Sequence, residues 1–375
     1  MTETLQKIQT TEDDSICASY RKQIDEKLIS TLDLHLHREH GSVYWLQREE
    51  QLGIDVRDTI RSMHDLPKLG VTDLSDFSQR SVWDFLPRSF WKNRRECIVG
   101  ESGGTTGRPT AALYTQADFQ AAFITPFLSA VELTGFPIER EWLWVGPSGP
   151  HIIGKVVREL SRNTGSPDPW SVDFDPRWVK KTPSGSFAAK RYLAHVIDQV
   201  LTLLERESPE VLFTTPPVLN ALAEQLNKKR RTQFKGIHYG GMPITADEIN
   251  RFRTLYPNAV HLSGYGNTMC GVAMELQDKQ RTTVDYYPHG ERLVYDVVQM
   301  NEKSNQWKSV KPGESGRVLF HRFDEGTFLP NLLERDYATL LEPVHFAMQQ
   351  GWISQGLRNP APPIHQKTQL KIGLY

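Results

Sequence analysis

Residues 102–110, Ser-Gly-Gly-Thr-Thr-Gly-Arg-Pro-Thr, have the composition of an anion-binding loop. Four hydroxylated residues and three glycines lie between two apolar runs, 97–99 and 111–114. Glycines let backbone N–H groups turn toward a bound anion, and Ser and Thr hydroxyls add further donors. In isolation such a cluster is more often an ordinary hairpin turn. As a phosphate loop, its predicted donors are Ser102, Gly103, Gly104, Thr105, Thr106 and Gly107.

This loop does not have the layout of a Walker-type P-loop. A P-loop has two glycines five positions apart, then Lys and Ser or Thr, and it opens a helix. No Lys follows Gly107, and the flanking runs predict two strands. The sequence therefore disfavours a P-loop NTPase.

Two further glycine-rich segments follow short apolar runs that predict strands. They are Gly240-Gly241-Met242-Pro243 and Ser263-Gly264-Tyr265-Gly266-Asn267-Thr268. In open α/β sheets, ligands bind at the carboxyl ends of strands. Tyr265 offers a flat face for a purine, and Thr268 could donate to a phosphate. Either segment alone is more often a simple strand end.

Composition excludes several classes of function. The chain has 375 residues and a formal net charge of -1, which gives no electrostatic case for nucleic acid or for an acidic membrane. Its three cysteines form no Cys-x-x-Cys motif, so neither a disulfide framework nor a cysteine zinc site is predicted. The polar N-terminus is not a signal peptide, and no apolar run reaches membrane-spanning length. We expect a cytoplasmic protein.

The elements around these segments can be predicted from periodicity and caps. Residues 1 to about 75 have a helical, charged pattern, with apolar positions at Ile24, Leu28, Leu32 and Leu34. Thr115 and Asp118 predict a capping box ahead of a Phe-rich helix. Strands and helices then alternate up to about residue 262, which indicates a largely parallel sheet. Residues 292–300 and 316–320 alternate as antiparallel strands do.

The order of the three glycine-rich segments resembles that in the adenylate-forming (ANL) superfamily, and in particular its phenylacetate–CoA ligase branch. There, a Ser/Thr/Gly-rich phosphate loop is followed by a Gly-Gly segment and a Tyr-Gly-x-Thr segment. The resemblance covers residues from about 50 to 345 and includes a Gly-Glu-x-Gly-like turn at 313–316. In detail the chain resembles short adenylating proteins of phenazine antibiotic tailoring.

The resemblance implies a layered α/β adenylation core with two largely parallel sheets and a small β-barrel-like subdomain. The expected division is a core at 1–280 in two subdomains, the barrel-like part at 281–345, and a tail or remnant hinge at 346–375. The superfamily's C-terminal domain is not expected in this chain.

The resemblance also assigns roles to individual residues. ATP, with AMP as the product-side ligand, would contact the phosphate loop, the two later segments and a ribose-binding Asp336. Thr268 and Arg108 would be catalytic. His151 and Met242 would contact the acid, although His151 could equally be an ordinary loop residue. The nucleotide-site residues expected beyond the phosphate loop are Gly240, Gly241, Gly264, Tyr265, Gly266, Asn267 and Asp336.

Three departures from the family pattern leave two functions open. Thr110 replaces the loop's usual closing Lys, and Met269 replaces an acidic residue that helps hold Mg²⁺, although Glu275 lies further along. The family's lysine-bearing C-terminal domain is not expected in this chain, and Lys367 and Lys371 lie in the tail without its sequence context. One hypothesis is ATP-dependent activation of an aromatic carboxylic acid, for which a phenazine carboxylate is a candidate, with Mg²⁺ as a candidate cofactor. A downstream acceptor or reductase would then take the acyl group. The other is a degenerate fold that binds nucleotide or acid without turnover.

Two weaker patterns are predicted to be structural. His35, His37 and His40 lie close together on a charged helix and predict a solvated face rather than a metal site. No Gly-x-Ser-x-Gly elbow is present, so a serine hydrolase is not predicted. No metal-ligating residues are assigned.

Overall fold

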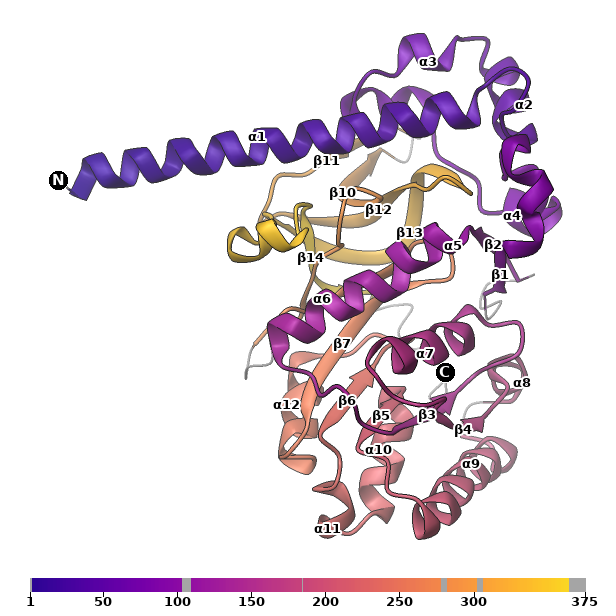
Figure 1. The fold of residues 1–375 in the computed structure, drawn as a ribbon, viewed down its shortest axis with the longest axis vertical. Helices are drawn as coiled ribbons and strands as arrows, with labels where there is room; N and C mark the ends of the chain where they lie inside the picture. Colours follow the sequence, from indigo (N-terminus) through magenta and orange to yellow (C-terminus); the bar gives the residue numbers. More distant parts are fainter. Residues whose placement is uncertain (1, 103–108, 184, 278–281, 302–305, 364–375) are drawn as a thin grey trace.

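Two six-stranded sheets form the body of the protein (Figure 1). The computed structural model describes residues 2–102, 109–183, 185–277, 282–301 and 306–363. The predicted α/β class is confirmed, with one correction. The described residues form one largely parallel sheet, not two, because the second large sheet is antiparallel and the strands beside the phosphate loop form only a hairpin.

The parallel sheet has the strand order β4-β3-β5-β6-β7-β8. Every neighbouring pair is parallel except β7 and β8. Helices follow several of its strands, as the alternating pattern predicts. The strands are β3 Trp142–Gly146, β4 Trp170–Asp173, β5 Val211–Thr214, β6 Gly236–Tyr239, β7 Val260–Asn267 and β8 Gly271–Met274.

The antiparallel sheet has the order β11-β10-β12-β13-β14-β9. The residues predicted at 292–300 and 316–320 lie, except for residue 292, in its paired strands β10 and β12. Its last strand in sequence, β14, pairs with β13 on one side and β9 on the other. A tail beginning at 346 therefore does not describe this segment, since β14 is an interior strand of the sheet. The strands are β9 Asp285–Tyr286, β10 Leu293–Asn301, β11 Gln306–Ser309, β12 Ser315–Phe323, β13 Phe328–Leu341 and β14 Gly356–Ala361.

The helices surround the sheets, and α1 extends well beyond the body (Figure 1). The α-helices are α1 Thr2–His35, α2 Val43–Leu52, α3 Val56–Thr59, α4 Asp76–Gln79, α5 Gln116–Phe119, α6 Thr125–Thr134, α7 Ile152–Asn163, α8 Pro176–Lys181, α9 Phe187–Arg206, α10 Pro216–Gln225, α11 Lys228–Arg231 and α12 Ala246–Leu255. Short 3₁₀ helices are η1 Met63–Leu69, η2 Val82–Asp84, η3 Arg88–Glu96 and η5 His345–Gln350, and η4 Gln120–Ile124 is a π-helical turn.

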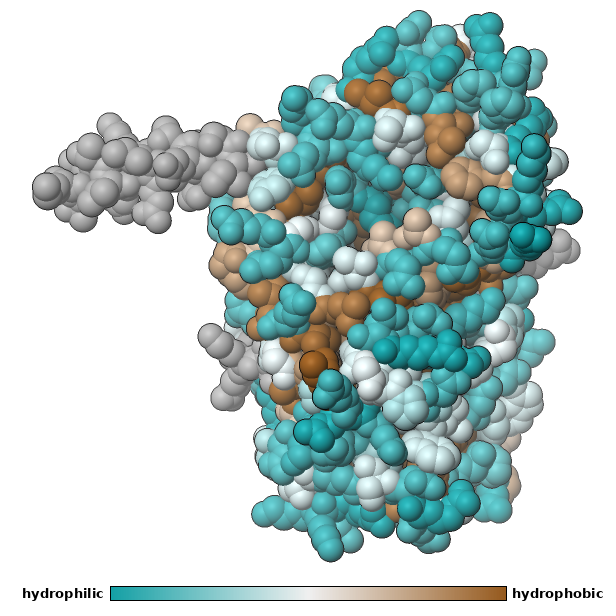
Figure 2. Space-filling model, in the orientation of Figure 1, coloured by the Kyte–Doolittle hydropathy of each residue, from teal (hydrophilic) through white to brown (hydrophobic). Residues whose placement is uncertain are grey.

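The helix that carries the phenylalanines runs between the two sheets (Figure 1). The predicted capping box is present, with Thr115 and Asp118 each bonded to the other's backbone N–H. The π turn η4 then widens the helix between α5 and α6, and such turns are frequent at functional sites. Figure 2 shows hydrophobic side chains gathered in a band across the middle of this face, where Figure 1 places the junction of the sheets.

The inner face of α1 differs from the prediction at two positions. Ile24, Leu28 and Leu32 are buried, but the series continues at Leu36 rather than at Leu34. His35, predicted on a solvated face, is fully buried, and its Nε2 lies 3.1 Å from the carbonyl oxygen of Asp324. Burial lowers the pKa of His35 to about 4. His35 therefore anchors α1 to the antiparallel sheet.

Candidate functional site

The hairpin of β1 (Ile98–Glu101) and β2 (Ala111–Tyr114) presents the predicted phosphate loop. Ser102 and Thr110 extend the pairing of the two strands by one more residue pair. The Ser102 N–H donates to the Thr110 carbonyl. The Ser102 Oγ accepts from the Thr110 N–H and from the Thr110 Oγ1, at 3.0 Å each. Thr110 therefore has a structural role in the hairpin. The remaining predicted loop residues lie outside the described residues; they are Gly103, Gly104, Thr105, Thr106, Gly107 and Arg108.

A cation from a distant helix reaches the base of this hairpin. Arg177, on α8, donates through Nη2 to Glu101 Oε2 at 2.5 Å and to the Ser102 carbonyl at 3.4 Å. Asp175 caps α8 by accepting from the Arg177 and Trp178 N–H groups, and this fixes the start of the helix that carries Arg177. Sequence reasoning missed Arg177, since nothing local relates it to residues 75 positions earlier.

A cavity opens next to the hairpin, at the carboxyl ends of the parallel strands. Its wall contains seven of the predicted site residues: His151, Gly240, Gly241, Gly264, Gly266, Asn267 and Thr268. Segments separated by more than a hundred residues therefore meet here, as expected for a ligand site in an open α/β sheet. Ser102, Met242, Tyr265 and Asp336 are not part of the cavity wall.

The rest of the wall is mainly apolar and aromatic. Side chains from the Phe-rich helix, from α7 and from strands β3 and β5 contribute to it, and they were not predicted as site residues. The Trp144 and Phe213 rings meet edge to face at 4.7 Å. An apolar pocket with a few convergent polar groups is typical of a small-molecule site. These wall residues are Phe123, Phe127, Trp144, Ile152, Ile153, Val156, Leu160 and Phe213.

Glycines keep the backbone of this wall close-packed. A Cβ on Gly266 would overlap the Gly271 carbonyl oxygen across the β7–β8 pair, and one on Gly240 would lie 3.2 Å from the Gly264 carbonyl oxygen. Gly241 has φ +78°, a conformation that favours glycine. The two glycine-rich segments thus pack against each other in a way that larger residues would prevent.

The segment Ser263–Asn267 was predicted as a loop after a strand, and this is wrong. It continues β7, and residues 264–267 pair antiparallel with residues 271–274 of β8. The glycines suggested a strand end, but the partner strand β8 supplies the hydrogen bonds that extend the strand. Only the tight turn 268–270 separates the two strands. Asn267 Oδ1 accepts from the N–H groups of Met269 and Cys270 and so stabilises this turn.

Tyr265, which is half-buried, and Asp336, which is buried, form a pair beside the cavity. The Tyr265 hydroxyl donates to Asp336 Oδ2 at 3.0 Å. The other carboxylate oxygen, Oδ1, is buried and has no hydrogen-bond partner among the described residues, although Arg335 Nε lies 3.8 Å away. Burial raises the pKa of Asp336. One oxygen of this carboxylate therefore has no hydrogen-bond donor among the described residues.

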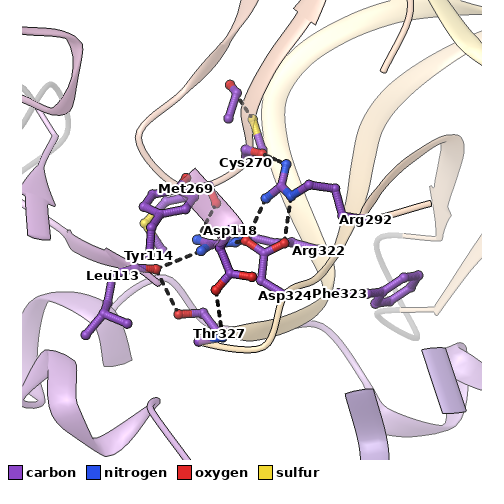
Figure 3. A network of polar contacts seen from close by, with 12 residues as sticks. Leu113, Tyr114, Asp118, Met269, Cys270, Arg292, Arg322, Phe323, Asp324 and Thr327 are labelled. Carbon is purple, nitrogen blue, oxygen red and sulfur yellow. Dashed lines mark hydrogen bonds and ion pairs between the residues drawn. The ribbon is translucent and has the colours of Figure 1, made fainter. Parts of the chain in front are cut away.

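A buried ionic network holds the turn 268–270 against the hairpin (Figure 3). Asp324 accepts two hydrogen bonds from Arg292, at 2.6 and 2.8 Å, and one from Arg322 at 2.6 Å. Arg322 also donates to the carbonyls of Met269 and Leu113, and Arg292 donates to that of Cys270. The network thus connects the antiparallel sheet, the hairpin and the turn.

In the Asp324 network, the carboxylate of Asp324 is paired with the guanidinium groups of Arg292 and Arg322 inside the core. All three ionised side chains are nearly inaccessible to solvent. Burial acts to raise the pKa of Asp324, but Arg292 and Arg322 outweigh it and hold this pKa below its usual value. Nearby, Asp118 accepts from the N–H groups of Glu325 and Gly326. No local pattern predicts this network, since its members are more than 200 positions apart in the chain.

The described residues offer no evident Mg²⁺ site. Met269 is 4% exposed, and its side chain is part of the hydrophobic core. Glu275 is buried directly after β8 and is not part of the cavity wall. No group of three or more His, Cys, Asp or Glu residues in the described part of the chain could hold a metal ion.

Comparison with known proteins identifies the fold. The chain matches no protein-family model and no curated protein sequence. Among solved structures it is similar to 2-hydroxyisobutyryl-CoA ligase in its postadenylation state with R3-HIB-AMP, with a TM-score of 0.64 and 13% identity over 93% of this chain and 69% of the ligase. The same ligase in its thioesterification state with 2-HIB-AMP and CoA gives a TM-score of 0.59 and 14% identity, over 91% of this chain and 67% of the ligase.

These matches show that the chain has the fold of the N-terminal domain of adenylate-forming (ANL) ligases. At this level of identity the similarity establishes the fold alone. The chain spans about two thirds of the ligase. Among the described helices, none is both long and apolar enough to cross a membrane.

Proposed function

We propose that this chain binds ATP and an aromatic carboxylic acid and activates the acid as its acyl-adenylate, releasing pyrophosphate. The observation that carries this proposal is the aromatic-walled cavity lined by Gly240–Gly241 and by Gly264–Thr268, beside the base of the predicted phosphate loop. The ANL ligase fold supports the reaction class. We further propose the cytoplasm as its compartment.

The residues would divide between nucleotide and acid as follows. Asp336, with its unpartnered Oδ1, would accept from the ribose hydroxyls of ATP or AMP. Tyr265 would hold Asp336 in place through its 3.0 Å hydrogen bond and flank the base. The apolar wall and His151 would hold the acid, with Met242 nearby, and Thr268 would contact the phosphate.

The chemistry requires an in-line displacement at the α-phosphorus. A carboxylate oxygen of the acid attacks, the bond from the α-phosphorus to the oxygen bridging to the β-phosphate breaks, and pyrophosphate leaves with that oxygen. Positive charge stabilises this transition state, and each such group is worth about 3 kcal/mol. Arg108 is the proposed source in the loop. Arg177 already lies at the loop's base, within 3.4 Å of the Ser102 carbonyl.

The sequence resemblance narrows the range of proposed acid substrates. It relates this chain to the short adenylating proteins of phenazine antibiotic tailoring, including that of D-alanylgriseoluteic acid biosynthesis, so a phenazine carboxylate is one proposed substrate. Phe123, Phe127, Trp144 and Phe213 provide the flat apolar surfaces that a fused aromatic ring would contact. An acceptor or reductase enzyme would then consume the acyl group.

Exchange of labelled pyrophosphate into ATP tests this proposal. The full chain is incubated with ATP, Mg²⁺ and single aromatic acids, and exchange is followed with and without each acid. We expect acid-dependent exchange at rates below the roughly 10 per second of an average enzyme. Exchange should rise if a partner protein lends a cation in trans. Acid-independent exchange, or none with any acid despite nucleotide binding, would contradict the proposal.

A second candidate function is nucleotide or acid binding without turnover. Two observations favour it. Thr110 stands in place of the loop's usual closing Lys and is bonded to Ser102, and Met269 is buried in the core, so neither supplies charge to the phosphates or to a metal ion. Binding of both ligands with no exchange would support this alternative.

A further inference from the structure

One residue in the aromatic wall of the cavity brings a different chemistry from its neighbours. His238 lies on β6 and is 4% exposed. Its ring centroid is 4.2 Å from that of Phe213 and 5.1 Å from that of Phe127. The two phenyl rings fix the imidazole plane but cannot satisfy its nitrogens. The polar groups of this ring must therefore find partners elsewhere.

The first nitrogen has its partner within the sheet. Nδ1 lies 2.8 Å from the carbonyl oxygen of Leu262 on the adjacent strand β7. A carbonyl oxygen only accepts, so Nδ1 must carry the proton in this contact. Burial lowers the pKa of His238 to about 4, although the Leu262 contact acts to raise it. At neutral pH the ring is uncharged, and Nε2 is a hydrogen-bond acceptor.

The second nitrogen has no such partner. Within the described residues, Nδ1 is the atom of His238 that makes a hydrogen bond, and Nε2 makes none. The Cε1 atom bonded to Nε2 lies against Gly264, where an added Cβ would be 3.3 Å away, and Gly264 and His238 both line the cavity. Nε2 is not among the buried side-chain atoms that lack a partner, so it is open to the cavity that His238 lines. The donor missing here would come from the cavity's occupant.

We propose that the acid bound in this cavity carries a hydrogen-bond donor on its ring, a hydroxyl or an amino group, that donates to Nε2 of His238. The identification of the cavity as an acid pocket rests on the proposed function. An acid with an apolar substituent at that point would leave Nε2 unpaired in a desolvated wall. Sites of this kind reject analogues that lack the donor.

Isothermal titration of the full chain with matched acids tests the proposal. The probes are ortho-, meta- and para-hydroxybenzoate, each compared with the toluate of the same substitution, since hydroxyl and methyl groups are similar in size. In the unmodified chain, at least one hydroxy acid should bind about 10-fold or more tightly than its toluate, which corresponds to one net hydrogen bond.

Three variants separate the nitrogen from the shape of the pocket. His238→Phe removes the acceptor and should reduce the preference for the hydroxy acid to less than about 3-fold. His238→Gln places an amide oxygen near the position of Nε2 and should restore part of that preference. Phe213→Leu alters the neighbouring wall but keeps Nε2, so it should weaken both acids of a pair to a similar extent.

The outcomes distinguish this inference from the proposed function. Equal binding of every matched pair by the unmodified chain, binding of none of the acids, or a preference that survives in His238→Phe would each overturn the inference. If His238→Phe does not fold, the ratio of hydroxy-acid to toluate affinity in the unmodified chain and in His238→Gln tests the inference. A clear preference without pyrophosphate exchange would uphold the inference while the catalytic proposal fails.

Discussion

The buried cluster around Asp324 and the cavity next to the hairpin differ in how completely their polar groups are hydrogen-bonded. Asp324 receives three hydrogen bonds from Arg292 and Arg322, and the two arginines also bond to three backbone carbonyls. Beside the cavity, Asp336 Oδ1 has no hydrogen-bond partner in the described structure, and neither has His238 Nε2. One region is satisfied from within the chain, and the other has acceptors that the proposed ligands would use. Variants in the first should therefore change stability, and variants in the second should change binding.

The largest effect is expected from Asp324→Ala. It leaves Arg292 and Arg322 buried without their counter-ion, which should cost roughly 3–5 kcal/mol in the free energy of unfolding. Urea denaturation measures it. The matched control is Asp168→Ala, because Asp168 also bonds two arginines, Arg158 and Arg162, but is half exposed.

The control should cost far less than Asp324→Ala, because solvent screens exposed ion pairs. Equal losses in the two variants would show that burial does not set the strength of the Asp324 cluster, and the contrast between the regions would fail there.

Acid should destabilise the chain through its buried histidines, of which His35 is the clearest case. Its folded pKa is about 4 against 6.5 for the ordinary value, so the unfolded chain binds the extra proton between these pH values. Stability is fully present above pH 6.5 and falls as the pH drops to about 4, by up to about 3 kcal/mol for this residue.

His35→Gln should flatten the pH dependence of unfolding between pH 4 and 6.5 by about one proton, measured by urea denaturation across that range. His37→Gln, the same substitution at an exposed position, is the control. An unchanged slope in His35→Gln would mean that this imidazole is not held neutral by burial.

A smaller effect, confined to binding, is expected from Asp336→Ala. Loss of the ribose contact should weaken ATP and AMP binding by roughly 1.5–3 kcal/mol, the range for hydrogen bonds to charged groups. Stability should be unchanged or slightly higher, because burial raises the pKa of this carboxyl and so disfavours its charged form. Calorimetry and denaturation together measure both.

Tyr265→Phe is the matched control for Asp336→Ala. It removes the hydroxyl that donates to Asp336 Oδ2 but keeps the carboxylate, so it should weaken nucleotide binding by less than Asp336→Ala does. An intact, stably folded Asp336→Ala with unaltered nucleotide affinity would remove Asp336 from the site.

Local signals predicted much of the fold. The predicted capping box at Thr115–Asp118 is present, because the two residues that form it are only three positions apart. The antiparallel pair β10–β12 also follows from its own alternating pattern. What the sequence could not predict depends on partners distant in the chain. β7 extends through Gly264 and Gly266 because β8 pairs with it, and His35 is buried because Asp324 lies opposite.

Part of the cavity wall was predicted, and the part that was missed also depends on contacts between distant segments. The glycine-rich segments have recognisable composition, and seven of their predicted residues and neighbours line one cavity. Its aromatic wall could not be predicted, because Phe123, Trp144 and Phe213 look like ordinary core residues until the helix and strands converge. His238 looked like a strand residue. Its unpaired nitrogen is visible only in three dimensions.

Transfer of oxygen-18 tests the central claim most directly. The chain, in stoichiometric amount, is incubated with ATP, Mg²⁺ and an aromatic acid labelled in its carboxylate. The mixture is quenched with hydroxylamine, which attacks the acyl carbon, and the AMP is analysed by mass spectrometry. If the carboxylate attacks the α-phosphorus, the released AMP carries one labelled oxygen, and the acid is recovered as its hydroxamate. AMP without label, or ATP that stays intact while both ligands are bound, would contradict adenylation by this chain.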